Sequence, residues 1–244
     1  MMRNLRSRAS AAARGDAGVT MAEMSVTTLV LGLLLASIAG MVVSSERITS
    51  GVKERLDQSN AATIAMQRIS RNLRTAVLQS QLTTACIIAA CTDSAFLVGS
   101  PTQVSFYADV DNPKNSVGPS RVTYTVTGGQ LIETVQKPDS PVPDTSGYHY
   151  CTAGTTGCVI RTEVLASGVQ TTSPVFAYYT AAAPSTAMTM ATGNTLSAAQ
   201  LKTVDSIDVT LQVLLPAGPA VGGATMVQRV ALPNADSVVR TDGT

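Results

Sequence analysis

The feature that most constrains this chain is a long uncharged segment close to its N-terminus. Met24 to Ser45 contains no Asp, Glu, Lys, Arg or His. As a helix, these 22 residues would rise roughly 33 Å, enough to cross a hydrocarbon core about 30 Å thick. The segment therefore predicts a membrane span at residues 24–45.

Apolar residues continue beyond the span at helical spacing, with no Pro before residue 101 to interrupt them. We therefore expect one helix from about Val19 to about Val77, roughly 90 Å long. Its amphipathic second half should bury one apolar stripe on a following domain. The stripe consists of Ala62, Met66, Ile69, Leu73 and Val77.

Charge is distributed unevenly around the span. Residues 1–79 carry ten Lys/Arg against five Asp/Glu, a net +5, whereas residues 80–244 carry seven against eleven, a net −4. The basic residues ahead of the span place the N-terminus in the cytoplasm and the acidic remainder outside it. They are Arg3, Arg6, Arg8 and Arg14.

The chain changes character near Ser80, where Thr, Ser, Gly, Pro and short β-branched runs take over. Gly128 and Gly129 separate two such runs and predict a tight hairpin turn. An α+β fold follows, with the long helix packed on an antiparallel sheet. The expected strands are Val104–Ala108, Arg121–Val126, Leu131–Val135, Val159–Val164, Val175–Tyr179, Ser206–Leu215 and Met226–Leu232.

The cysteines form two close pairs, Cys86 with Cys91 and Cys151 with Cys158. Both pairs follow the span, where an exported domain meets oxidising conditions, so two local disulfides are expected. Four unconnected thiols remain the alternative. No Cys-x-x-Cys spacing or His ligand set points to a metal.

The residues just ahead of the span form a specific pattern: Gly18, Val19, Thr20 and, after two more residues, Glu23. A carboxylate at the start of a membrane helix is costly unless it lies at the interface or meets a positive partner. In these positions the chain resembles the type IV prepilin family. The signature of that family is a Gly at the cleavage point, then an apolar residue that becomes the new N-terminus, usually followed by Thr, and a Glu four residues beyond the new N-terminus. Val19 replaces the usual Phe.

The resemblance implies a cleaved leader (1–18), a long helix (19–79) and a β-rich head (80–244) in a pilin-like fold. It implies that a membrane prepilin peptidase cuts between Gly18 and Val19 on the cytoplasmic side and methylates the freed amine of Val19. Glu23 would then pair with the amine of a neighbouring subunit and set the register of assembly, since an unpaired charge is penalised in an apolar surrounding.

The stretch from Met66 to Ala76 and the hairpin from Val122 to Val135 resemble the large minor subunits, the J-type pseudopilins and W-type minor pilins. The implied function is that of a minor subunit of a pilus, type II secretion or DNA-uptake filament. The implied partners are other pilin subunits, the prepilin peptidase, a membrane assembly platform and lipid. The implied location is the inner membrane, single-pass, and later an extracellular filament.

Three alternatives stay open at this stage. In the first, Glu23 only caps an ordinary signal anchor; in the second, a signal peptidase cuts after Ala39 and releases a secreted domain. In either case the head would be an adhesin or binding module that never polymerises. Arg68, Arg71 and Arg74 predict a solvated basic face more than a nucleic-acid site, so DNA is the less favoured direct ligand.

Catalytic and cofactor sites find little support in the sequence. The single histidine, His149, lies in a loop setting without a nucleophile, metal-ligand or phosphate-binding pattern around it. Asp109 and Asp111 resemble an acidic calcium loop only weakly, and a turn is the better interpretation. We therefore expect no enzyme activity, no cofactor and no bound metal.

Overall fold

The computed structural model of the protein describes residues 18–82, 94–110, 112, 114, 116–144, 147–190, 194–214 and 223–233. The chain divides into two compact units, residues 1–51 and residues 52–244. The first unit contains the uncharged segment, and the second contains the β-rich head. The predicted cleaved leader, apart from Gly18, lies outside the described residues.

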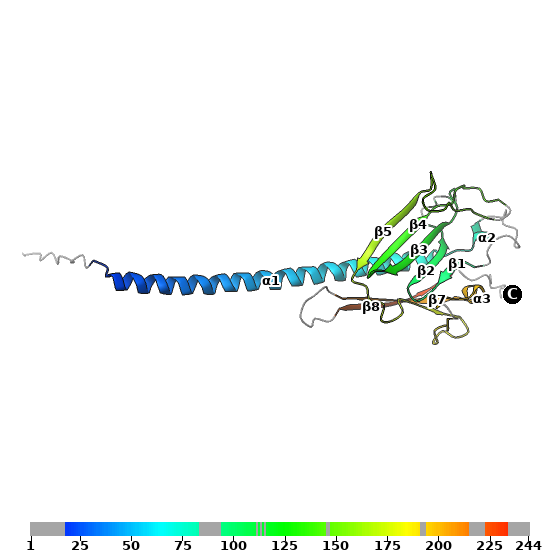
Figure 1. The fold of residues 1–244 in the computed structure, drawn as a ribbon. Helices are drawn as coiled ribbons and strands as arrows, with labels where there is room; N and C mark the ends of the chain where they lie inside the picture. The colour runs from blue at the N-terminus through cyan, green and yellow to red at the C-terminus, as the bar shows by residue number, and fades with distance from the viewer. Residues whose placement is uncertain are drawn as a thin grey trace, which may run out of the picture. The chain divides into compact units, whose positions relative to one another are not determined.

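Helix α1 (Met21–Arg74) confirms the predicted long helix (Figure 1). It ends three residues before the expected Val77 because the chain leaves the helix to pair with a strand. Thr75 Oγ1 donates to the carbonyl of Asn72 at 2.7 Å, and the backbone N–H of Val77 donates to the carbonyl of Tyr107 at 2.9 Å. Val77 is buried as expected, but from an extended segment and not from the helix.

The head contains two antiparallel sheets, whereas the sequence predicted one. The first has the order β1-β2-β3-β4-β5, with neighbours in space also neighbours in sequence, and the second has the order β6-β7-β8. Their strands are β1 (Phe96–Gly99), β2 (Gln103–Ala108), β3 (Ser120–Thr127), β4 (Gln130–Gln136), β5 (Ile160–Ser167), β6 (Phe176–Tyr179), β7 (Ser206–Val213) and β8 (Ala224–Ala231). Two one-turn helices, α2 (Gln79–Leu82) and α3 (Ala198–Leu201), complete the described elements.

The hairpin between β3 and β4 confirms the turn predicted at the two glycines. Gly128 and Gly129 have φ values of 56° and 72°, and Thr127 faces Gln130 across the turn. Positive φ at both central positions defines a type I′ turn, whose twist matches that of the strands it joins. The turn fixes the register in which Leu131 and Val135 face the core.

The last three turns of α1 pack into the head. Its apolar stripe is buried from Ala62 onward, and Ile69 and Leu73 are fully buried. On one side Asn72 hydrogen-bonds to Tyr124 of β3, and on the other Ser70 donates to Gln228 of β8 at 2.8 Å. The helix end therefore lies between the two sheets, as Figure 1 shows, and one apolar cluster joins all three elements.

Candidate functional site

The start of α1 is the region to which the sequence assigned function. Gly18, Val19 and Thr20 precede the helix and are exposed, and nothing lies within 4 Å of the position that a side chain at Gly18 would occupy. The carbonyl of Thr20 accepts from the N–H groups of Glu23 at 3.0 Å and Met24 at 3.1 Å. The peptide bond between Gly18 and Val19 is thus accessible and outside the helix.

Thr20 is the cap of this helix. Its hydroxyl Oγ1 accepts from the backbone N–H of Glu23 at 3.3 Å and satisfies one of the free donors of the first turn. Glu23 lies in that first turn with its side chain exposed. A carboxylate there also interacts favourably with the positive end of the helix dipole. Among the described residues, no ion pair involves this carboxylate.

The apolar segment of α1 could cross a membrane, judged by length and composition. Its most apolar stretch has a mean hydropathy of 2.4, and none of that stretch is buried within the protein. The hydroxyls of Ser25, Thr28 and Ser37 each donate to the backbone carbonyl four residues earlier at 2.9 Å. These internal hydrogen bonds lower the cost of placing the hydroxyls in hydrocarbon.

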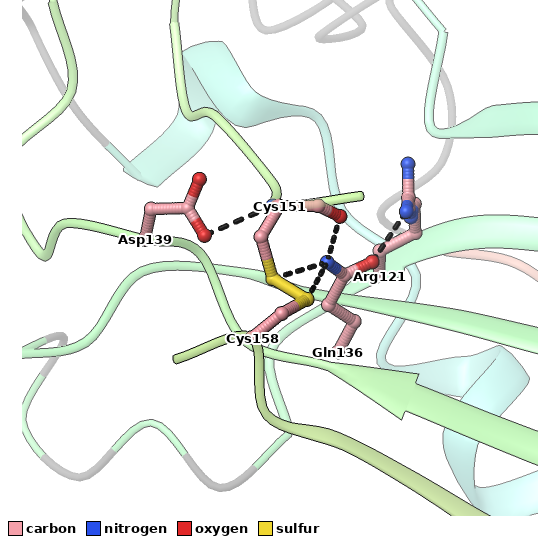
Figure 2. Close-up of a disulfide and its surroundings, with 5 residues drawn as sticks. All are labelled: Arg121, Gln136, Asp139, Cys151 and Cys158. Carbon is pink, nitrogen blue, oxygen red and sulfur yellow. Dashed lines mark hydrogen bonds between the residues drawn. A yellow bond between two sulfur atoms is a disulfide. The ribbon is translucent and has the colours of Figure 1, made fainter. Parts of the chain in front are cut away.

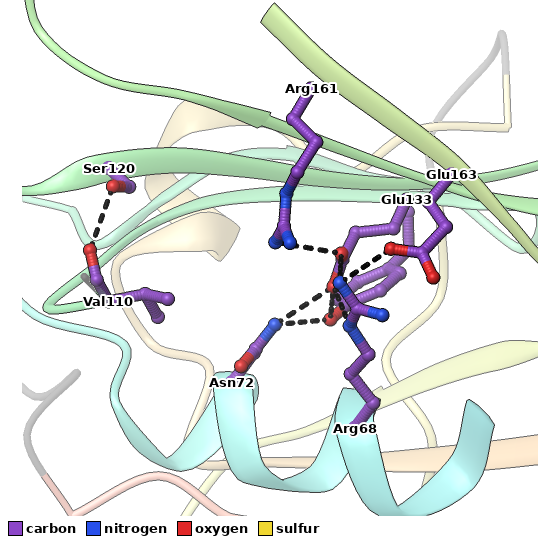
Figure 3. Close-up of polar contacts among 8 residues, drawn as sticks. Arg68, Asn72, Val110, Ser120, Glu133, Arg161 and Glu163 are labelled. Carbon is purple, nitrogen blue, oxygen red and sulfur yellow. Dashed lines mark hydrogen bonds and ion pairs between the residues drawn. The ribbon is translucent and has the colours of Figure 1, made fainter. Parts of the chain in front are cut away.

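A second polar site lies inside the head, where α1 meets β3, β4 and β5 (Figure 3). Its centre is Glu133 of β4, whose side chain is 1% exposed. Arg68 binds both of its carboxylate oxygens, with Nη2 2.6 Å from Oε2 and Nε 3.1 Å from Oε1. Oε1 also accepts from Asn72 Nδ2 at 3.0 Å and from the hydroxyl of Tyr124 at 2.8 Å. Arg161 Nη2 lies 3.4 Å from Oε2.

Glu163 of β5 completes this charge cluster. Its Oε2 lies 2.9 Å from Arg68 Nη2, so Arg68 bridges two carboxylates on neighbouring strands. Two arginines and two glutamates balance each other, and only Glu133 is fully buried. A buried carboxylate is tolerated when several donors satisfy its lone pairs, as they do here. The cluster attaches the helix to the sheet at one defined rotation.

The cluster also shifts the ionisation of its members. Burial raises the pKa of the Tyr124 hydroxyl, and the adjacent charge of Glu133 raises it further. Burial acts to lower the pKa of Arg68, but the hydrogen bond to Glu163 and the charge of Glu133 outweigh it, and the net direction is upward. Both groups therefore keep their protons at any physiological pH.

The prediction of a solvated basic face is wrong for Arg68 and right for its neighbours. Arg68 is a quarter exposed and bound to two carboxylates, whereas Arg71 and Arg74 are exposed. The sequence contained a signal for the cluster, because Glu133 alternates with Leu131 and Val135 and so must face the core with them. A carboxylate at a core position calls for a cation, and α1 supplies it.

The predicted disulfide between Cys151 and Cys158 is present (Figure 2). Gln136 of β4 holds it, donating to the carbonyl of Cys151 at 2.6 Å while its Oε1 accepts from Arg121. Asp139 accepts from the N–H of Cys151 at 2.9 Å. The bridged loop between β4 and β5 is thereby attached to the end of β4. The other predicted pair, Cys86 and Cys91, lies outside the described residues.

The remaining polar candidates form ordinary surface contacts. His149 Nε2 lies 2.8 Å from Asp144 Oδ2, and both side chains are more than half exposed. Asn112 Nδ2 donates to Asp109 Oδ1 at 2.8 Å, and Asn112 Oδ1 accepts from the N–H of Val117. The turn predicted at Asp109 and Asp111 stays a prediction. Asp111 lies outside the described residues, and within them no group of three or more metal-binding side chains occurs.

Comparison with known proteins adds no relative. No family model matches the chain, and no curated protein matches it.

Proposed function

We propose that this protein is a minor pilin or pseudopilin, a structural subunit that assembles into or initiates a type IV pilus-like filament. The observation that carries the proposal is the geometry at the start of α1. An accessible, non-helical Gly18-Val19 bond stands directly before a capped helix whose first turn contains Glu23 and whose next 22 residues, 24–45, are uncharged. Cleavage there would leave a new amine at Val19, four residues before Glu23, the only carboxylate of residues 19–45.

The exposed apolar surface of the first unit supports assembly through α1. Its Leu, Val, Ile and Met side chains, from Met24 to Val43, are 46–77% exposed. Such a surface needs lipid or other helices around it. In a bundle of identical helices, the amine of Val19 in one subunit and Glu23 of the next would neutralise each other in a low-dielectric setting. Glu23 would thereby fix the axial register of neighbouring subunits.

On this proposal the protein is made in the inner membrane with its N-terminus in the cytoplasm and its head outside. A prepilin peptidase removes the leader, and an assembly platform extracts the mature subunit from the lipid. The loop-rich head suits a subunit near a filament tip better than a repeating one. The function is assembly and not catalysis, and neither cofactor nor DNA enters it.

The geometry of Glu23 also favours one rival function, that of a membrane-anchored β-rich binding module that does not polymerise. Glu23 lies in the first turn of the helix that Thr20 caps, where a carboxylate interacts favourably with the helix dipole, so it has a local use without any neighbour. A secreted head released by cleavage after Ala39 belongs to the same class. The two classes differ in the N-terminus of the mature protein.

Mass spectrometry of the native N-terminus separates these functions. A mature chain that begins with methylated Val19 supports the filament subunit, and Gly18→Val should block that cleavage. A chain that begins at Met1 or Gly40 refutes it.

The replacement Glu23→Ala tests the register directly. The variant should remain in the membrane but reach sheared filaments in much smaller amounts, because the amine of its neighbour loses its counterion. Glu46→Ala, at the other flank of the span, is the matched control and should be incorporated normally. Equal incorporation of both variants would show that Glu23 has only its local role.

A further inference from the structure

Strand β5 is the free edge of the five-stranded sheet. It pairs with β4 on one side, and no strand of the described part of the chain pairs with it on the other (Figure 1). Its middle residues, 161–164, are all exposed, and Val164 is 50% exposed. Val159, just before the strand, is 79% exposed. An eight-residue open edge with exposed valines is a surface on which another strand can pair.

The β3–β4 turn shows which backbone groups of β4 point toward β5. A two-residue type I′ turn closes a hydrogen-bonded pair, here Thr127 with Gln130, and the pairs then alternate along the ladder. On β4, even-numbered residues therefore bond to β3, and Glu133 and Val135 direct their backbone groups to β5. The N–H of Val126, the residue before Thr127, accordingly points away from β4 and donates to Thr102.

The same alternation identifies the open groups of β5. Glu163 faces Glu133 and Arg161 faces Val135, so these two residues use their backbone groups on β4. Ile160, Thr162 and Val164, which lie between and beside them, direct their N–H and C=O groups to the open edge. The open ladder is thus centred on Thr162.

The sequence around Thr162 is symmetric in chemical character. It reads Val159-Ile160-Arg161-Thr162-Glu163-Val164-Leu165, with apolar residues outside and one charge of each sign inside. When such a strand pairs antiparallel with a second copy about a two-fold axis at Thr162, a residue that precedes Thr162 by some number of positions faces the residue of the other copy that follows Thr162 by the same number. Arg161 then faces Glu163 of the second copy, twice over, and Ile160 faces Val164.

Charge selects this register against its neighbours. A two-fold axis at Arg161 would place Arg161 opposite itself, and an axis at Glu163 would place two carboxylates opposite each other. An axis between two residues would bring open backbone groups against residues already bonded to β4. Arg161 and Glu163 are 52% and 47% exposed, so their side chains remain accessible beside their contacts to the Glu133 cluster.

We propose that β5 is a self-association surface, through which two copies of this chain join their five-stranded sheets into one continuous sheet across a two-fold axis at Thr162. The proposal requires only the head, so it stands or falls independently of the filament function. The opposing interpretation is that Arg161 and Glu163 merely protect an exposed edge from aggregation.

Cross-linking of the full chain in mild detergent tests the geometry. Facing Cα atoms of paired strands lie about 4.5–5.5 Å apart, within the range that a disulfide spans. Thr162→Cys should therefore form a covalent dimer on mild oxidation. The matched control is Val227→Cys, which is 64% exposed on the open edge of the other sheet and should form no covalent dimer on oxidation. The wild type, which has no cysteine at β5, should form none either, although it associates non-covalently. Equal cross-linking of all three proteins would overturn the proposal.

Two further variants test the ladder and the charges by sedimentation. Thr162→Pro removes an N–H of the open edge and leaves the bonds to β4, so it should abolish the dimer, whereas Thr162→Val should keep it. Glu163→Arg should weaken dimerisation about tenfold, and adding Arg161→Glu should restore it. The melting temperature of each variant is measured as the control for folding. A monomeric wild type, a dimer that survives Thr162→Pro, or failure of the double charge exchange to restore association would refute self-pairing at β5.

Discussion

Replacing Arg68 by Met should lower the free energy of unfolding of the head by about 3 kcal/mol. The change removes both hydrogen bonds that Arg68 makes to Glu133, a carboxylate 1% exposed. Breaking one side of a buried ion pair costs about 3–5 kcal/mol, because the other charge stays behind in an apolar surrounding. The lower end applies here because Arg68 is 25% exposed and Glu133 keeps Asn72, Tyr124 and Arg161.

The reciprocal change, Glu133→Leu, should cost a similar amount, since the hydroxyl of Tyr124 loses the acceptor of its hydrogen bond. The double variant removes both charges and leaves an apolar contact between α1 and β4. It should therefore lose only about 3 kcal/mol and not the sum of about 6. Glu163→Gln is the matched control: Glu163 also binds Arg68, but at 47% exposure its loss should cost less than about 1 kcal/mol.

Urea titration of the full chain, followed by circular dichroism of the β-sheet signal, measures all four variants. The coupling energy between Arg68 and Glu133 from the double-mutant cycle should be about 3 kcal/mol. Additive effects, or a cost of Arg68→Met no larger than that of Glu163→Gln, would show that the cluster does not fix the helix on the sheet.

Two further predictions concern the second sheet and the disulfide loop. The hydrogen bonds from Arg229 lower the pKa of Asp208 below its usual value of about 3.9, so this contact adds stability above that pH and loses it as the pH falls through the folded pKa. The melting temperature of Asp208→Asn should accordingly lie below that of the wild type at pH 6, and the gap should close as the pH falls through the lowered pKa of Asp208. Replacing Cys151 and Cys158 together by Ser removes a cross-link between residues seven positions apart, and the free energy of unfolding should fall by about 2.5 kcal/mol. Urea unfolding measures this, and an unchanged midpoint would contradict it.

The parts of the fold that the sequence predicted well are those set by local rules. The continuous helix followed from an unbroken apolar period without Pro, and the β3–β4 hairpin from Gly128 and Gly129 at positions that need positive φ. The Cys151–Cys158 bridge followed from two thiols close in sequence. Each of these features is determined by residues near one another in the chain.

The features that the sequence did not predict depend on distant partners. Strand β1 was missed because its four residues are too short to show alternation, and it is held by β2 and by a hydrogen bond from Leu196 to Gly99. The division into two sheets could not be inferred, because alternation shows that a strand has a buried face but not which strand lies beside it. The role of Arg68 was misjudged for the same reason: its partner is 65 residues away.

Glu133 depends both on local sequence and on distant partners. Its place in the alternation of β4 identifies it from local sequence as a core-facing carboxylate, and only the packing of α1 between the sheets explains how it is satisfied. These contacts fix the rotation of α1 about its own axis, with Arg68 and Asn72 toward β4 and Ser70 toward β8. If α1 transmits force or register from a membrane or a filament, as we propose, this cluster is the point at which the head is coupled to it. A head with Glu133→Leu and Arg68→Met should then fold, yet hold the helix less specifically, and comparing its incorporation with that of Glu23→Ala would separate coupling from register.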